Sequence, residues 1–554
     1  MFANHDIPAA SSAGCKRSVF VTETNTQTLK PVDLTVMTLS DRALRLLICL
    51  VCLLVMALTL SVVFVLVACT HISDGSLRFA SYYGDHMVLQ KSPEKAVLWG
   101  YGPESAQVTI SLSGLLKHRT WQVTVTKGIW HVTLDPVEAG GPYNVTAAVQ
   151  KSTATLTDVL FGDVWLCGGQ SNMYFKTSQI FNASQEMALA AKYPHVRTFM
   201  VALNLSETEL TDLIQVQLPW SVPTAGNVAE FSAVCWLFGR YMYENLGYPI
   251  GLVESCWGGT PVEAWSSSRA LQQCGLENSP KDRNSVLWNA MIHPLLNMTI
   301  RGAIWYQGEE NAAYHQEMYN CSFPAMIDDW RMAFHQGSGG QTAHDFPFGF
   351  VQLSTFKKGS TDDGFPNIRW HQTADIGFVP NPHMQKTFMA VAMDLPDETS
   401  PYGTIHPRDK QDVAFRLTLG ARAVAYNEKD VPFQGPFPDR ILSTPVYVNI
   451  TYDQAVSVTP SKDTFEICCS GIKTPCGPKS LWVTAPIMQW NLNTVQLPAN
   501  LCPPTEEVAA LRYAWRDWPC DFKACPVYSA SRILPAPPFV INRYAVKGHI
   551  WESS

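Results

Sequence analysis

Apolar, strand-like runs alternate with longer helical patterns over residues 159–427, and this alternation limits the possible fold more than any other feature of the sequence. The apolar runs lie at 164–166, 250–253, 303–305 and 388–393. Strands that alternate with helices predict parallel pairing, because a parallel strand pair needs a long crossover connection. The sequence therefore predicts an α/β domain with a mostly parallel sheet over 159–427.

Shorter alternating segments flank this region on both sides. On the N-terminal side they lie at 96–99, 107–112, 121–125 and 130–134, separated by Gly and Pro turns, and they predict a small β-sandwich over 72–158. Beyond residue 427 the helical pattern ends, and strand-like segments return at 446–451, 455–458, 481–483 and 508–513. A chain of 554 residues exceeds one ordinary core, so we expect a third, β-rich domain over 428–554.

An uncharged apolar stretch of 24 residues, 46–69, follows an N-terminal polar tail, 1–45. Its length suits a transmembrane helix, and Arg42 and Arg45 precede it. We expect a signal anchor, with a cleaved signal peptide as the alternative. Both place the rest of the chain outside the cytosol, in the secretory pathway as a lysosomal or secreted protein, or held at a membrane through 46–69.

Glycosylation motifs and cysteines agree with that location. Six Asn-x-Ser/Thr acceptors follow the apolar stretch: Asn144, Asn182, Asn204, Asn297, Asn320 and Asn449. Eleven cysteines also follow it, an odd number, so at least one thiol stays free or pairs between chains. The group from Cys468 to Cys525 predicts a disulfide framework. A zinc site is the less favoured reading, because no His stands at ligand spacing beside these cysteines.

Composition excludes two classes of protein. The 46% hydrophobic and 16% charged residues exclude a disordered chain. The net charge of −7 is spread without long runs of one sign, so the sequence offers no basic stripe for nucleic acid.

The strongest chemical signal is the run Gly-Asp-Val-Trp-Leu-Cys-Gly-Gly-Gln-Ser-Asn-Met at 162–173. An apolar strand enters two glycines and then Ser171, which places a hydroxyl on a tight turn at the carboxyl edge of the sheet. By itself this is also the pattern of a glycine-rich turn with a helix-capping serine. Because Asn172 and Met173 follow, it is not the Gly-x-Ser-x-Gly elbow of many lipases.

Four ordered blocks carry a family resemblance. They are Gly-Gly-Gln-Ser-Asn-Met at 168–173, Ser-Cys-Trp-Gly-Gly-Thr-Pro-Val-Glu-Ala-Trp at 255–265, Trp-Tyr-Gln-Gly-Glu-Glu-Asn at 305–311, and the segment from Asp394 to Arg408. Together they resemble the sialate O-acetylesterases of the SGNH hydrolase superfamily, and the resemblance covers about 79–537. It implies a three-layer α/β serine esterase that hydrolyses O-acetyl esters of sialic acids, including 9-O-acetyl esters. An acetyl esterase for other glycans, such as acetylxylan, and an inactive glycan-binding homologue are the alternatives.

The resemblance also implies roles for individual residues. Ser171 is the nucleophile and His406 its base. The Ser171 backbone N–H, an N–H of the Gly258–Gly259 turn, here assigned to Gly259, and the side-chain amide of Gln307 form the oxyanion hole. Gln307 stands where many SGNH enzymes have Asn.

The carboxylate that orients the histidine is where this sequence departs from the superfamily. The position three residues before His406, usually Asp, is Gly403. We expect Asp394 to take the role, because it closes the strand at 388–393. Asp397, or a backbone carbonyl that orients a Ser–His dyad, is the alternative.

Arg369 and Arg408 are candidates to pair with the carboxylate of a sialic acid. The mechanism requires no metal and no organic cofactor. The expected partner is an O-acetylated sialic acid or sialoglycoconjugate.

Overall fold

The computed structural model describes residues 75–114, 118–150, 152–277, 284–477, 480–544 and 550–553. The chain divides into two units, Met1–Gly75 and Ser76–Ser554, and nearly all described residues lie in the second. Among them, no helix is both long and apolar enough to cross a membrane. The predicted anchor at 46–69 and the polar tail at 1–45 fall outside the described residues.

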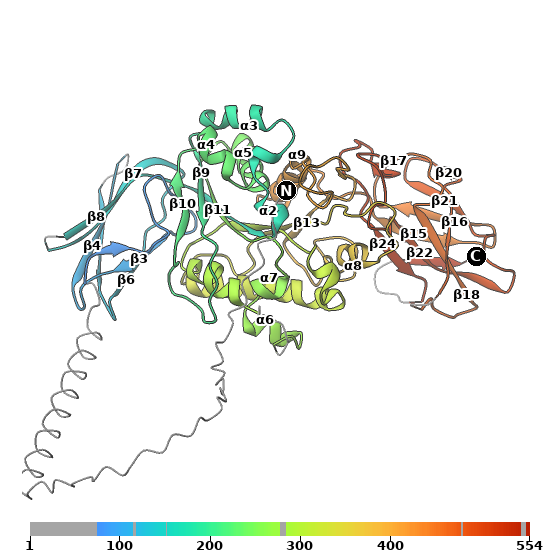
Figure 1. Ribbon diagram of the computed structural model, residues 1–554, viewed down its shortest axis with the longest axis horizontal. Coiled ribbons are helices and arrows are strands. Elements are labelled where there is room, and N and C mark those ends of the chain that lie inside the picture. Colours follow the sequence, from blue (N-terminus) through green and yellow to red (C-terminus); the bar gives the residue numbers. More distant parts are fainter. Residues whose placement is uncertain are drawn as a thin grey trace, which may run out of the picture. The chain divides into compact units, whose positions relative to one another are not determined.

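A mixed sheet forms the centre of the second unit (Figure 1). Its parallel strands lie in the order β9 (Val196–Val201), β11 (Ile250–Cys256), β8 (Ser152–Gly169), β12 (Gly302–Tyr306), β13 (Phe348–Gln352) and β14 (Thr387–Val391). The edge strand β10 (Val216–Ser221) is antiparallel to β9. Every residue of β11, β12 and β13 is buried, as expected for continuous apolar strands with both faces covered. The predicted strands at 164–166, 250–253, 303–305 and 388–393 are confirmed.

Helices cover both faces of this sheet (Figure 1). On one face α5 (Ala233–Leu246) packs against α9 (Gln411–Val424), and α7 (Tyr319–Gly337) lies on the other. The shorter helices are α2 (Ser171–Tyr174), α3 (Ala183–Leu189), α4 (Ala225–Glu230), α6 (Ser268–Gln273) and α8 (Gly364–His371).

The N-terminal part is all β in the described residues. A sheet β1–β3–β6 faces β2, β4, β5 and β7, which join the central sheet through β8. The strands are β1 (Arg78–Phe79), β2 (Val88–Gln90), β3 (Val97–Tyr101), β4 (Gln107–Gly114), β5 (Arg119–Thr124), β6 (Ile129–Thr133) and β7 (Gly140–Val149). The first half of β8 pairs with β7, and its second half lies between β11 and β12. One strand thus runs through the boundary predicted between residues 158 and 159, so the two parts are built on a shared strand.

The C-terminal part is β-rich, and the described residues beyond α9 contain no helix. Two sheets, β20–β21–β16–β15–β25 and β19–β18–β22–β24, and the pair β17–β23 enclose a second core. The strands are β15 (Pro438–Ser443), β16 (Tyr447–Tyr452), β17 (Val456–Val458), β18 (Phe465–Gly471), β19 (Trp482–Thr484), β20 (Gln489–Trp490), β21 (Thr494–Pro498), β22 (Glu506–Tyr513), β23 (Val527–Ser529), β24 (Phe539–Asn542) and β25 (Ile550–Ser553).

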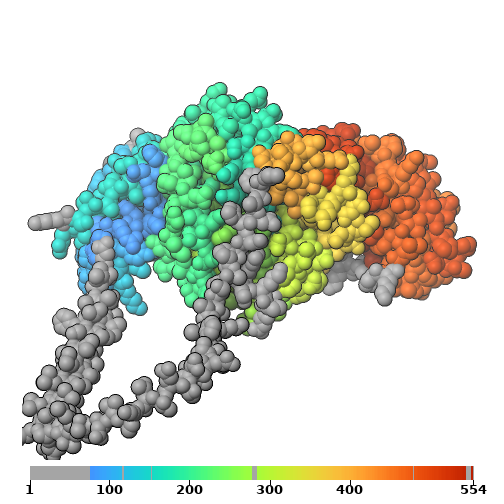
Figure 2. Space-filling model, viewed as in Figure 1, coloured from blue at the N-terminus to red at the C-terminus, as the bar shows by residue number. Residues whose placement is uncertain are grey.

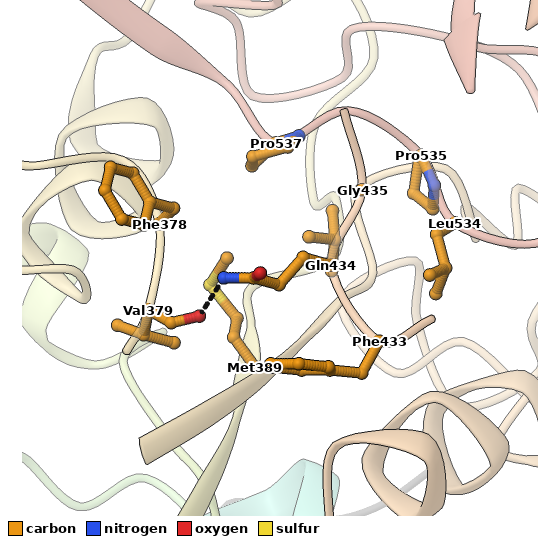
Figure 3. A pocket seen from close by; sticks show the side chains of 10 residues that line it. Phe378, Val379, Met389, Phe433, Gln434, Gly435, Leu534, Pro535 and Pro537 are labelled. Atoms are coloured by element: carbon orange, nitrogen blue, oxygen red, sulfur yellow. Dashed lines mark hydrogen bonds between the residues drawn. The ribbon is translucent and has the colours of Figure 1, made fainter. Parts of the chain in front are cut away.

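The C-terminal part packs directly on the α/β part. Figure 2 shows its orange and red atoms against the yellow surface that precedes them in the sequence. In Figure 3, Phe378, Val379 and Met389 face Gln434 and Leu534 across a cavity of about 20 Å³. Gln434 Nε2 donates to Val379 O at 2.7 Å across this contact. Because the cavity is so small, the two parts meet with close packing.

Five disulfides tie the described residues together. Three lie in the C-terminal part, as the cysteine group at 468–525 predicts: Cys468–Cys476, Cys469–Cys502 and Cys520–Cys525. Cys167–Cys235 fastens α5 to β8, and Cys274–Cys321 joins α6 to α7. Cys256 is free and buried, which accounts for the odd number of cysteines.

Candidate active site

Ser171 begins α2 two residues after the end of β8, the central strand of the sheet. Gly169 has φ +140°, and a β-carbon there would lie 2.2 Å from Tyr306 O, so only glycine fits. A β-carbon on Gly168 would lie 2.9 Å from the Trp305 ring. The two glycines therefore let β8 end tightly against β12, and the turn leaves Ser171 partly exposed at the carboxyl edge.

His406 lies beside Ser171, although 235 residues separate them in the sequence. Its Nε2 is 2.8 Å from Ser171 Oγ, and its Nδ1 is 2.9 Å from the backbone carbonyl of Tyr402. Because a carbonyl only accepts, Nδ1 carries the proton, and Nε2 is free to accept the proton of the serine hydroxyl. The imidazole also stacks on Phe175, with ring centroids 6.3 Å apart. This is the geometry of a nucleophile and its base.

A turn at Gly403 brings the Tyr402 carbonyl to the histidine. Gly403 has φ +88°, and its carbonyl accepts from His406 N at 2.9 Å. The residue that replaces the usual superfamily Asp thus has a backbone conformation that suits glycine. The dyad oriented by a backbone carbonyl, one of the three arrangements left open by the sequence, agrees with this geometry.

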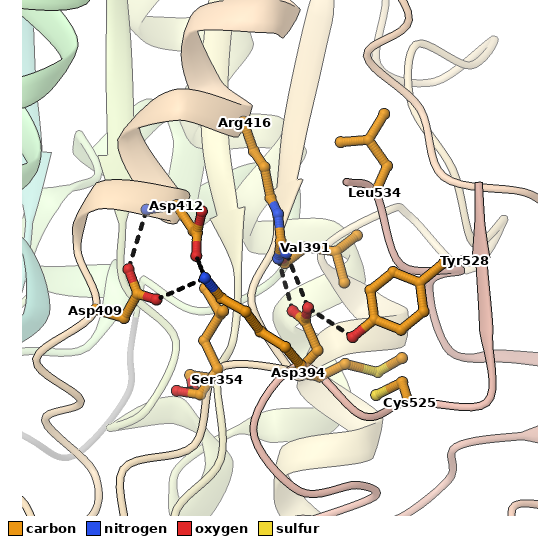
Figure 4. A network of polar contacts seen from close by, with 12 residues as sticks. Ser354, Val391, Asp394, Asp409, Asp412, Arg416, Cys525, Tyr528 and Leu534 are labelled. Atoms are coloured by element: carbon orange, nitrogen blue, oxygen red, sulfur yellow. Dashed lines mark hydrogen bonds and ion pairs between the residues drawn. The ribbon is translucent and has the colours of Figure 1, made fainter. Parts of the chain in front are cut away.

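The prediction that Asp394 orients His406 is wrong, because its carboxylate is committed elsewhere (Figure 4). Asp394 is fully buried, and its two oxygens accept from Arg416 Nη1 at 2.6 Å and Nη2 at 2.8 Å. Tyr528 Oη donates to it at 2.9 Å from the C-terminal part. Asp397 pairs with Arg408 instead of the histidine. Asp394 therefore holds α9 and the C-terminal part in place.

Two backbone N–H groups near the serine are unused. Among the residues that the structure describes, none accepts a hydrogen bond from the N–H of Ser171 or of Gly259. The Gly258–Gly259 turn lies close to Ser171, since a β-carbon on Gly258 would be 3.3 Å from Ser171 Cβ. Gly259 has φ +67°. These groups are available to an oxyanion.

Gln307 does not match its predicted role as a direct donor in this arrangement. It is fully buried, and its Nε2 donates to Thr260 O at 3.2 Å and to Asn311 Oδ1 at 2.7 Å. Its Oε1 accepts from Tyr319 Oη at 2.9 Å. Both amide hydrogens are thus engaged, and one of them holds the carbonyl of the residue that follows Gly259.

A buried polar network that the sequence analysis did not single out lies behind the dyad. Lys410, with no exposed surface, donates from Nζ to Asn172 Oδ1 at 2.7 Å. Asn172 Nδ2 in turn donates to Glu309 Oε1 at 2.6 Å and to Ile405 O at 2.9 Å. Asn172 follows Ser171 and Ile405 precedes His406, so this amide joins the two loops that carry these side chains.

Burial and charge set the protonation of these groups. Burial lowers the pKa of His406, the bond to Tyr402 raises it, and the ammonium of Lys410 lowers it. Together these effects lower the pKa of His406, which favours the neutral imidazole that a base needs. Burial lowers the pKa of Lys410 to about 7, against the opposing effect of nearby carboxylates such as Glu309. Burial raises the pKa of Glu309.

Arg369 is not a substrate contact, contrary to the sequence prediction. Its side chain is fully buried and donates to four backbone carbonyls, those of Leu353, Ser354, Arg516 and Asp517. Its function in the structure is to join the loop after β13 to the C-terminal part. Arg408 is partly exposed, but Asp397 already neutralises it through bonds of 2.6 Å and 2.9 Å, and its guanidinium lies 4.5 Å from the Phe181 ring centre.

The remaining surface features concern metal and glycans. In the described part of the chain, no three His, Cys, Asp or Glu side chains are grouped so that they could hold a metal ion. All six predicted glycosylation acceptors are at least partly exposed, and Asn144 and Asn182 are the most open.

The sequence gives only weak signals for Lys410, Asn172 and Glu309, the three residues of the buried network that the sequence analysis did not predict. Lys410 is one of 40 basic residues and lies just beyond a His-Pro pair, where nothing in the sequence marks it as buried. Asn172 and Glu309 stand inside the quoted blocks, next to Ser171 and Gln307, and that proximity was the available clue.

Comparisons with known proteins agree over most of the chain. The model described as "Carbohydrate esterase, sialic acid-specific acetylesterase" matches residues 161–403, and "Sialate O-acetylesterase C-terminal domain" matches residues 441–543. The sialate O-acetylesterase of Mus musculus is 50% identical over 515 residues, which cover 84% of this chain and 94% of that protein. The Homo sapiens protein of the same name is 51% identical over 489 residues, covering 84% and 92%. The crystal structure of a carbohydrate acetylesterase from Xanthomonas citri superposes with a TM-score of 0.71 at 29% identity, covering 84% of this chain and 99% of that one.

Proposed function

This chain belongs to the sialate O-acetylesterase family, and we propose that it releases acetate from O-acetylated sialic acids with Ser171 as nucleophile and His406 as general base. It is a carboxylic ester hydrolase. The observation that carries the residue assignment is the 2.8 Å contact between Ser171 Oγ and His406 Nε2, with Nδ1 held by a carbonyl.

The proposed reaction has two displacements. His406 Nε2 takes the hydroxyl proton as Ser171 Oγ attacks the acetyl carbonyl, and it returns that proton to the departing sugar hydroxyl. The acetyl group is left on Ser171. Water then attacks the acetyl-serine as His406 Nε2 takes its proton. The imidazole returns that proton to Ser171 Oγ as the bond between Oγ and the acyl carbon breaks, and acetic acid leaves and ionises to acetate. Each proton passes through one nitrogen atom, so the reaction requires no third titratable group.

The oxyanion of each tetrahedral intermediate is assigned to two backbone donors, the N–H groups of Ser171 and Gly259. Their lack of acceptors supports this assignment. Gln307 is proposed to position the turn through Thr260 O, which keeps the Gly259 donor aimed at the site. Loss of one oxyanion donor typically costs about a hundred- to a thousand-fold in rate.

The finer fold assignment is also a proposal. A central β8 with β11 and β9 on one side and β12 to β14 on the other places Ser171 at the point where strand order reverses, where α/β sheets bind ligands. This supports an SGNH-type domain over about 159–427 between β-rich domains at 72–158 and 428–554.

The five disulfides indicate an extracellular or secretory-pathway protein. We propose a lysosomal or secreted enzyme, glycosylated at the six acceptors, which are all at least partly exposed, and anchored through 46–69 if that segment is retained. Glycosidase treatment after an alkaline membrane wash tests this. Protein that stays with the membrane and shrinks on deglycosylation supports an anchor, and soluble protein indicates cleavage.

Ser171→Ala tests the chemistry. We expect acetate release from 9-O-acetylated sialic acid to fall by several powers of ten, on the order of the 10⁶ lost with a serine nucleophile, while thermal unfolding is unchanged. His406→Ala should be comparably damaging, and the double variant little worse, because the two act as a unit. Wild-type turnover by Ser171→Ala would exclude the assignment.

A substrate panel separates the alternative functions. Hydrolysis of acetylxylan in preference to acetylated sialic acid would indicate an acetyl esterase for other glycans. No hydrolysis of either sugar or of an aryl acetate would indicate an inactive glycan-binding protein. Sialic acids acetylated at defined positions then give the positional preference.

A further inference from the structure

A cleft of about 470 Å³ lies between the α/β part and the C-terminal part, and neither Ser171 nor His406 lines it. One wall is the loop 359–363, which follows β13. The other comes from β18, β22 and the segment after β22: Glu466, Arg512, Trp515, Arg516 and Trp518. The volume is within the range of small-molecule sites, which is about 300–1,000 Å³.

Two tryptophans give the cleft amphipathic surfaces. Trp515 and Trp518 are both half-buried. The Trp518 Nε1–H is buried, and no described residue accepts its hydrogen bond. Lys358 lies 5.6 Å from the Trp518 ring centre, while Trp515 meets Trp370 edge to face at 6.2 Å. Indole rings present a flat apolar face, which suits the C–H face of a sugar.

Polar groups in the cleft have unused hydrogen-bonding capacity. Arg512 Nε donates to Glu466 Oε2 at 2.8 Å, and in the described part of the chain Glu466 Oε1 accepts no hydrogen bond. Within the same residues, the Asp363 carboxylate has no hydrogen-bond partner. Three carboxylates and two guanidiniums line the cleft, so it does not select an anion. Mixed donors and acceptors without a dominant charge match neutral hydroxyls.

Buried contacts hold the two walls in place. Arg369 donates to the carbonyls of Arg516 and Asp517 at 2.6 Å and 2.7 Å, and to the loop after β13 at Leu353 and Ser354. Asp517 Oδ1 and Oδ2 accept from Phe356 N at 2.7 Å and Lys357 N at 3.0 Å. A cleft built on such contacts is preformed, so a ligand loses little affinity in ordering it.

The cleft belongs to the same edge of the sheet as the dyad. Its loop wall follows the carboxyl end of β13, as Ser171 follows that of β8. Phe356 O, in the same loop, accepts from Thr404 Oγ1 at 2.7 Å, and Thr404 is two residues before His406. The loop that carries the base and the loop that walls the cleft are therefore bonded to each other.

We propose that this cleft is a subsite for a neutral sugar unit of the glycan that carries the acetylated sialic acid, recognised by Trp515, Trp518 and Glu466. The inference rests on the proposed function. It makes the C-terminal part a contributor to substrate choice, favouring glycan-linked over free sialic acid.

Kinetics on two substrates test the subsite. The measured quantity is kcat/KM for 9-O-acetylated sialyllactose divided by kcat/KM for free 9-O-acetylated sialic acid. In Trp515→Ala this ratio should fall about tenfold, which corresponds to the loss of about 1.4 kcal/mol that one good contact contributes. Trp518→Ala, which removes the ring, and Glu466→Gln should lower the same ratio through KM. Trp490→Ala, an exposed tryptophan on β20 outside the cleft, is the matched control. An unchanged ratio in all three cleft variants would overturn the proposal.

Lactose binding gives a readout that does not depend on hydrolysis. Saturation-transfer NMR should show lactose signals with the Ser171→Ala protein and lose them when Trp515→Ala is added. Absence of lactose signals in both would overturn the subsite even if the esterase is active. If lactose binds but neither sialic acid substrate is hydrolysed by the wild type, the proposed function fails while the sugar site stands. Thermal melts identify a variant that is simply unfolded, and Glu466→Gln then supplies the test.

Discussion

Asp394→Asn distinguishes a structural carboxylate from a catalytic one. In the structure the two oxygens of Asp394 neutralise the buried guanidinium of Arg416 at 2.6 Å and 2.8 Å, and Arg416 is only 4% exposed. An amide keeps the shape but removes the charge, which leaves that guanidinium buried without a counter-ion. Removing one partner of a buried pair costs about 3–5 kcal/mol of unfolding free energy. At a few degrees per kcal/mol, the melting temperature should fall by roughly 5 to 15 °C.

Catalysis should respond differently from stability. Because Tyr402 O orients His406, the folded Asp394→Asn enzyme should hydrolyse an aryl acetate at 25 °C with a kcat/KM within about threefold of wild type. Thermal melts and initial rates on the same preparations measure both effects. Glu398→Gln is the control, since Glu398 and its partner Lys358 are both more than half exposed, and exposed ion pairs contribute little to stability. A loss near 10⁴ in rate with an unchanged melting temperature, as for a triad Asp replaced by Asn, would refute the reasoning.

Three further predictions concern the base. Burial holds the pKa of His406 below its usual value of about 6.5, so the acid limb of the pH profile of kcat/KM should have its midpoint below about pH 6.5. A midpoint above about 6.5 would contradict the lowered pKa of His406. Lys410→Met removes an ammonium that lowers this pKa, so the acid limb of the pH–rate profile should move to higher pH; an unmoved limb would show that Lys410 does not act on His406. Gly403→Ala meets no atom within 4 Å of its added β-carbon but must adopt φ +88°, a strain of about 1–2 kcal/mol. It should lower kcat more than it raises KM, and an unaltered kcat would argue against orientation by Tyr402 O.

Periodicity and motif spacing were sufficient for the framework of the molecule. The helical patterns between the apolar runs became helices such as α9, and the apolar runs became buried parallel strands. These signals are local, because a strand or helix that buries one face must repeat its apolar residues along that face. Glycine at 168 and 169 is likewise a local requirement of the turn before Ser171. Such features need no knowledge of distant partners.

Partners of charged side chains were not predictable in the same way. Asp394 begins a block that resembles an active-site segment, and Arg369 was a candidate partner for the substrate carboxylate. Each instead satisfies groups from the C-terminal part, Tyr528 in one case and the carbonyls of residues 516 and 517 in the other. Nothing in the sequence near residue 394 indicates Tyr528, which is 134 residues away. The errors arise at the contact between two parts of the chain, where the packing of one on the other decides which carboxylate is left free.

The arrangement around His406 has a physical consequence for catalysis. A carbonyl fixes the tautomer as a carboxylate does, but it lacks the negative charge that stabilises the imidazolium formed in the transition state. The nearby ammonium of Lys410 disfavours that cation further. With burial, and compared with an imidazole held by a carboxylate, both effects leave the base with a lower proton affinity, which weakens it in neutral solution and keeps it unprotonated in acidic solution. The site therefore exchanges basicity in neutral solution for an unprotonated base in acidic solution, a balance that the charge on residue 410 should control.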